Sequence, residues 1–220
     1  EYNVRLGVET LHPLVSVIDL SKVDPINNMR LIFDFYVVFL KEDKNCDLLY
    51  GRQRYDYQKG SIVSLAPGQV IGTEDTGEKF QPKGWALCFH PDLIRGTTLG
   101  RNIKEYTFFS YEVNEALHLS EKERTIIIDC LEKIRYELQQ SIDRLSKRLI
   151  ATNIELLLDY CLRFYERQFI TRGNVNHDIL TRFERLLDNY FIGPKAAQNG
   201  LPSVKECANK LCLSPNYFGD

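Results

Sequence analysis

Three groups of residues in the 220-residue sequence have types that can do chemistry: four histidines, six cysteines and one polar run near the C-terminus. The histidines stand far apart in the chain, at His12, His90, His118 and His177. No His-x-His pair of the kind that converges on a metal occurs. No Cys-x-x-Cys pair occurs either, and most cysteines stand in apolar patterns typical of buried free thiols. We therefore predict no metal, no cofactor and no catalytic site, and a hydrogen-bonded structural role for His90.

The polar run covers residues 203–218 and reads SVKECANKLCLSPNYF. Ser203 and Glu206 have the spacing of a capping box, which satisfies backbone N–H groups at the start of a helix. Ser214 followed by Pro215 has the pattern of a second helix start. Two helices joined by a short turn form a helix-turn-helix, whose second helix enters the DNA major groove. The same spacing also fits a plain helical hairpin that closes a bundle.

The part of the chain before this run must position it. We expect β structure from residue 1 to about residue 110. Aromatic and β-branched residues dominate short runs separated by turn signals, a spacing typical of antiparallel sandwiches and barrels. The run from Trp85 to His90 is apolar on both faces, which predicts an interior strand. Residues 66–69 are expected to form a turn. The predicted strands cover residues 33–40, 48–50, 54–57, 60–65 and 85–90.

Beyond residue 120 the apolar period becomes helical. Ser120 and Glu123 form a second capping box, and an apolar stripe follows it. A second helix is expected from about Arg144 to Arg167. The stripes of these helices either cover the β domain or form a dimer seam. Their candidate dimer residues are Ile127, Leu131, Ile134, Leu138, Leu145 and Leu149.

The sequence between residue 173 and the helix expected at Ser214 predicts two further helices. An amphipathic helix over residues 179–190 ends at Gly193 and Pro194, and the helix that begins after Ser203 follows a short polar connection. The small side chain of Ala208 would allow a second helix to cross closely over the first.

The run at 203–218 resembles the first helix-turn-helix of AraC-type transcription regulators, whose Ala, Leu, Leu-Ser and Tyr pattern it matches. The order of parts is also similar to that family, and the run at 84–93 resembles the last barrel strand and its following turn. The resemblance implies an α+β protein with three parts. These are an antiparallel cupin-like (jelly-roll) sensor barrel at 1–115, linker and dimerisation helices at 116–172, and a partial helix-turn-helix domain at 173–220.

The resemblance also assigns DNA contacts, and barrel geometry suggests an effector pocket. The expected DNA-binding residues are Ser203, Ser214, Asn216 and Tyr217. A small barrel either fills its interior with side chains or leaves a cavity for a ligand. The candidates for lining such a pocket are Tyr36, Tyr55, Trp85 and Phe89. The same four side chains could instead pack in the hydrophobic core.

Two departures from the family pattern weaken the expected grip on DNA. Cys212 occupies a turn position that is commonly Gly. The sequence ends at Asp220, six residues into the expected recognition helix, whereas the family has a second helix-turn-helix beyond that point. Residues 176–220 carry five basic and five acidic side chains, and DNA affinity depends on phosphate neutralisation. We therefore expect tight DNA binding to need residues beyond 220.

Composition limits the class of protein. The net charge is −2, so a whole-chain electrostatic attraction to nucleic acid is absent. No secretion signal and no membrane span are evident, which favours a cytoplasmic protein. The sequence predicts a homodimeric DNA-binding transcription regulator, not an enzyme, with a possible small-molecule effector. The alternatives are a cupin-like small-molecule-binding protein or isomerase with a helical dimerisation appendage, and a regulator whose barrel is filled by its own side chains.

Overall fold

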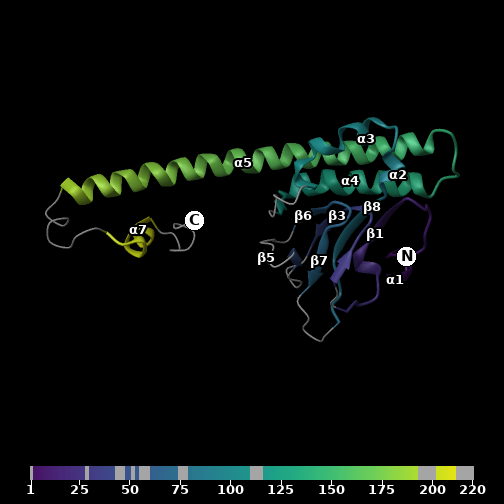
Figure 1. Cartoon of the computed structure of the whole chain (residues 1–220), viewed down its shortest axis with the longest axis horizontal. Helices are drawn as coiled ribbons and strands as arrows, with labels where there is room; N and C mark the ends of the chain where they lie inside the picture. The colour runs from purple at the N-terminus through teal and green to yellow at the C-terminus, as the bar shows by residue number, and fades with distance from the viewer. Residues whose placement is uncertain are drawn as a thin grey trace. The chain divides into compact units, whose positions relative to one another are not determined.

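The computed structural model describes residues 2–27, 30–42, 48–50, 53–54, 60–73, 79–109, 116–192 and 202–211. It is an α+β structure with antiparallel sheets, as predicted (Figure 1). The chain divides into two compact units, residues 1–165 and residues 166–220. Within the described residues, none of the helices has the length and apolar character needed to span a bilayer.

The first unit contains two sheets, and every strand pair in them is antiparallel. The five-stranded sheet has the order β1 (Val15–Asp19), β8 (Gly84–Phe89), β3 (Tyr36–Lys41), β6 (Ser61–Leu65) and β9 (Leu117–His118). The four-stranded sheet has the order β2 (Arg30–Ile32), β7 (Val70–Thr73), β4 (Leu48–Tyr50) and β5 (Gln53–Arg54). Because β8 lies between β1 and β3, the predicted interior position of this strand is confirmed.

The helices follow the strands in the chain. The two long ones are α4 (Glu121–Leu138) and α5 (Ser146–Ile192), and α7 (Val204–Leu211) comes last. The short α-helices are α1 (Tyr2–Arg5), α2 (Pro91–Ile94) and α3 (Thr98–Asn102). The 3-10 turns are η1 (Leu20–Lys22), η2 (Ile103–Glu105) and η3 (Thr107–Phe109).

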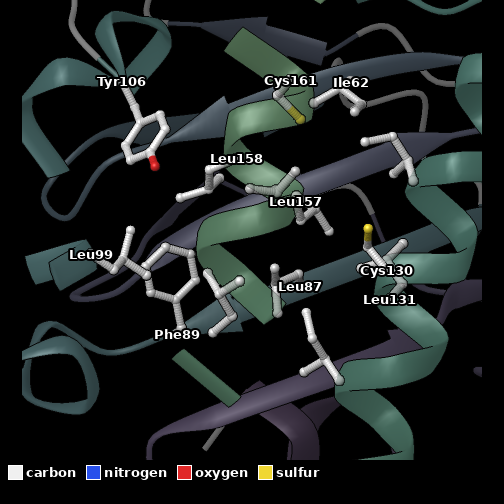
Figure 2. Close-up of a cluster of buried hydrophobic side chains, with 14 of the residues drawn as sticks. Ile62, Leu87, Phe89, Leu99, Tyr106, Cys130, Leu131, Leu157, Leu158 and Cys161 are labelled. Carbon is white, nitrogen blue, oxygen red and sulfur yellow. The ribbon is translucent and has the colours of Figure 1, made fainter. Parts of the chain in front are cut away.

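The five-stranded sheet is buried on both faces because successive side chains of a strand point to opposite sides. On β8, Leu87 and Phe89 join a cluster with Leu131 of α4 and Leu158 of α5 (Figure 2). The side chains on the opposite face of the sheet form a second cluster with residues of the other sheet, such as Ile71. One layer of the core therefore lies between this sheet and the helices (the sheet–helix layer), and the other lies between the two sheets (the inter-sheet layer).

The expectation of β structure up to residue 110 is wrong for residues 91–109, which form short helices and 3-10 turns. The ring Nδ1 of His90 accepts a hydrogen bond from the backbone N–H of Asp92 (3.1 Å), and Pro91 occupies the first helical position. This local capping begins α2 directly after β8. The predicted hydrogen-bonded structural role of His90 is thereby confirmed.

The expected break between the second and third helices is also absent, because α5 runs without interruption from Ser146 to Ile192. The predicted boundary at residues 172–173 falls inside this helix. Gly173 marks the position in the sequence, yet one Gly costs a helix only about 1 kcal/mol relative to Ala. The helical preference of the flanking residues outweighs that local cost.

Candidate functional site

The start of α7 is built by the capping box predicted at Ser203. The backbone N–H of Ser203 donates to Glu206 Oε2 (2.9 Å), and the backbone N–H of Glu206 donates to Ser203 Oγ (3.3 Å). The Ser203 hydroxyl also donates to Glu206 Oε2 (3.0 Å). These bonds, led by the one from the Ser203 backbone, hold the pKa of Glu206 below its usual value. Both Ser203 and Glu206 are exposed.

The buried face of α7 consists of Cys207, Ala208 and Leu211, whereas Lys205 and Asn209 are exposed. Ala208 has no exposed surface. The second helix expected to cross over it, with Ser214, Asn216 and Tyr217, lies outside the described residues. Ser203 is therefore the only predicted DNA-contacting residue among those the structure describes.

Two cations of the second unit make contacts inside that unit. The Arg182 guanidinium donates to the backbone carbonyl of Leu211 (3.2 Å), at the C-terminal end of α7. The Lys210 ammonium lies 5.6 Å from the ring centroid of Tyr190, a cation–π distance. The sequence analysis counted both side chains only for their charge and did not predict these contacts. No sequence spacing signals the first contact, because Arg182 lies 29 positions before Leu211.

The predicted effector-pocket residues lie on the helix side of the five-stranded sheet. Tyr36 stacks on Phe89 with ring centroids 5.0 Å apart, and Phe89 is fully buried. The guanidinium of Arg135 on α4 lies over the Trp85 ring, 5.1 Å from the ring centroid. Tyr55 lies outside the described residues. These three side chains therefore serve core packing, the other role that the sequence left open.

The described part of the inter-sheet layer is filled by apolar side chains. Val37, Val63 and Cys88 of the five-stranded sheet pack in one cluster with Ile71 of the other sheet. Phe33 joins them and meets Tyr2 at a ring-centroid distance of 5.1 Å. A small pocket of about 100 Å³ lies beside this cluster, and its lining includes Tyr2, Phe35 and Cys88.

The two predicted dimer stripes have different surroundings. The α4 stripe is buried against the protein's own sheet and α5, at Ile127, Leu131, Ile134 and Leu138. Leu145 and Leu149 instead remain 46% and 42% exposed. Of the two roles left open for the stripes, α4 covers the β domain, and α5 keeps an exposed apolar face.

Four of the six cysteines fall in the described residues with their side chains resolved: Cys88, Cys130, Cys161 and Cys207. All four are buried free thiols, which confirms the prediction for them. Burial raises the pKa of the Cys88 and Cys161 thiols, so both stay protonated. Cys46 and Cys212 lie outside the described residues. Among the described side chains, no group of three or more His, Cys, Asp or Glu residues is placed to hold a metal ion.

Comparison with known proteins gives no relative: no protein-family model matches the chain, and no curated protein does.

Proposed function

We propose that this chain is a sequence-specific DNA-binding transcription regulator of the AraC type, with α7 as the first helix of its helix-turn-helix. The observation that carries the proposal is the construction of α7 itself. Its capping box fixes the start of the helix, and Ala208 lies fully buried on its inner face. A helix that supports a recognition helix needs both properties, because its partner must cross it closely and at a fixed angle.

The first unit would act as the sensor and dimerisation part of this regulator. Its two antiparallel sheets are compatible with the cupin-like jelly roll that the family resemblance implies, which is part of the proposal. Leu149 and Leu156 of α5 are exposed, as is Leu145 directly before the helix. Their spacings of four and seven residues place them on one side of the helix. We assign this face to a homodimer contact.

The test is selection of binding sites from a random duplex library by the intact gene product, with any residues translated beyond Asp220. We expect enrichment of a paired motif, because a symmetric dimer reads two half-sites. Asn216→Ala should weaken binding to the selected site about tenfold, the value of one good base contact, and spare binding to a scrambled duplex. Lys205→Ala should weaken both duplexes equally, as loss of a phosphate contact does.

The control variant is Lys122→Ala, which removes an exposed cation from α4 and should leave both affinities unchanged. Fluorescence anisotropy over a salt series measures all four proteins. Equal affinity for the selected and scrambled duplexes, or no enrichment at all, would remove the regulator proposal. For the dimer, Leu149→Arg should shift the sedimentation coefficient toward the monomer value. An unchanged coefficient would exclude this face as the contact.

A further inference from the structure

A cleft of about 570 Å³ lies in the first unit, between the segment at 95–101 and the first turns of α5. Its volume is within the range of small-ligand sites, which run from about 300 to 1,000 Å³. Its lining does not include Tyr36, Trp85 or Phe89, the described residues predicted for an effector pocket. The side chains that give it its character are Arg95, Arg101, Arg144, Lys147, Arg148 and Glu155.

The lining of this cleft is strongly cationic in a protein whose net charge is −2. Five of its residues are Arg or Lys, against the single carboxylate of Glu155. Arg95 is paired with Asp92 (2.6 Å), which leaves the other four cations as the main charges of the lining. Burial raises the pKa of Glu155, and the nearby Arg101 opposes that rise. Arg101, Arg144, Lys147 and Arg148 are all exposed, so the positive charge lines an open cleft that a ligand can reach from solvent.

The backbone wall opposite α5 is held in place by its own bonds. Thr97 Oγ1 accepts from the Gly100 N–H (3.1 Å) and donates to the Ile94 carbonyl (2.6 Å). A Cβ added at Gly100 would lie 2.1 Å from that same carbonyl oxygen, so only Gly allows the close approach. The Lys147 ammonium donates to the Arg95 carbonyl (3.1 Å) and ties α5 to this wall. The cleft is thus preorganised before any ligand enters.

The cations on the α5 side occupy the end of a helix that disfavours them. The N-terminus of a helix carries partial positive charge and is stabilised by acidic side chains. The first turn of α5 has no acidic residue, and Arg144, Lys147 and Arg148 surround it instead. Asp143 accepts from the N–H groups of Leu145 (2.7 Å) and Ser146 (2.9 Å), just outside the cleft lining. An anion in the cleft would relieve the remaining repulsion.

We propose that this cleft binds a small ligand that carries two or more phosphate groups. Arginine guanidinium groups match phosphate oxygens in bidentate pairs, and four cations around one cavity exceed what a single phosphate needs. A duplex is the less fitting occupant, because protein surfaces that bind DNA specifically bury about 1,000–2,500 Å² of protein, whereas this cleft is concave and of small-molecule size. The inference stands independently of the DNA-binding proposal.

The test measures pyrophosphate binding to the intact protein by isothermal titration calorimetry, at constant ionic strength adjusted with KCl. We expect saturable binding, with inorganic phosphate and sulfate binding at least tenfold more weakly. The double variant Arg101→Gln/Arg148→Gln should lose at least tenfold in pyrophosphate affinity. Arg148→Lys keeps the charge but loses the fork of donors, so it should lose less than the double variant. Lys122→Gln is the matched control, because it also removes a cation from the first turn of a long helix.

Three results would overturn the proposal. One is pyrophosphate binding that Lys122→Gln weakens as much as the double variant does. Another is equal affinity for pyrophosphate and sulfate. The third is the absence of pyrophosphate binding together with a weaker affinity of Arg148→Lys for duplex DNA, which would make the cleft part of a DNA-binding surface. Because no arm of the pyrophosphate titration includes DNA, its failure is distinguishable from failure of the regulator proposal. Far-ultraviolet circular dichroism establishes that each variant is folded before its affinity is compared.

Discussion

The two units of the chain differ in how their helices are stabilised. In the first unit, α4 and the N-terminal part of α5 bury complete apolar stripes against a sheet that is itself covered on its other face. In the second unit, α7 is eight residues long and buries Cys207, Ala208 and Leu211, supported by a capping box and the Arg182 contact. An isolated helix of that length is unstable in water, so these few contacts carry a large share of its stability.

This contrast shows that the strongest functional signal of the sequence does not coincide with its largest core. The helix-turn-helix pattern lies in the second unit, whereas the sheet–helix and inter-sheet layers lie in the first. Elements with few buried contacts open at a lower free energy than elements of a large core. We therefore expect the two units to respond separately to mutation, and the predictions below test that separation.

The largest effect is expected in the sheet–helix layer. Leu158→Ala should lower the free energy of unfolding of the first unit by about 2–5 kcal/mol, because the side chain is fully buried and leaves a cavity. Tyr136→Ala, on α4 and 61% exposed, should change it by less than about 0.5 kcal/mol. Urea denaturation followed by the fluorescence of Trp85, the single tryptophan, measures both variants. Similar losses in the two variants would contradict the assigned core.

A smaller effect is expected at the inner face of α7. Ala208→Leu should destabilise the second unit by about 1–3 kcal/mol, because added methylene groups do not fit a fully packed position. Amide hydrogen exchange should accelerate in α7 and stay unchanged in β8 of the first unit. Asn209→Leu, at the exposed neighbour, serves as the control. If β8 lost protection together with α7, the two units would form one cooperative structure.

The smallest effects are expected at the two capping boxes. An N-cap Ser→Ala change costs about 1 kcal/mol of helix stability. Ser120→Ala should leave α4 helical, because its buried stripe remains packed against the sheet. Ser203→Ala should visibly reduce the helical content of α7, whose buried face has only three residues. Backbone chemical shifts measure both helices, and an equal loss of helix in the two would contradict the contrast drawn here.

The same variant tests the pH dependence of α7. The pKa of Glu206 in the folded chain is below its usual value of 4.5, so its stabilising bonds are present above that value. They are lost as the pH falls through the folded pKa, when the carboxylate gains a proton. In Ser203→Ala the pKa of Glu206 should rise toward 4.5, as followed by NMR titration of the carboxyl carbon. An unchanged pKa of Glu206 in this variant would show that the bonds to Ser203 do not cause the lowered pKa.

Local patterns were sufficient to predict local structure. The capping boxes at Ser120 and Ser203 form as predicted, because their bonds join residues only three positions apart. The interior strand β8 and the apolar stripe of α4 follow from residue type and period alone. Cys130 and Cys161 are buried free thiols because their apolar neighbours place them on those same buried faces.

Where elements meet was decided by the tertiary structure. Alternation separates the two faces of β8 but does not tell which face meets the helices. The sequence therefore left a pocket or the core open for Trp85 and Phe89, which lie in the sheet–helix layer. Arg182 reaches Leu211 across 29 positions, and Arg101 and Arg148 share a cleft although they are far apart in sequence. Periodicity reports the environment of one element at a time. Contacts between distant segments depend on packing that no single element contains.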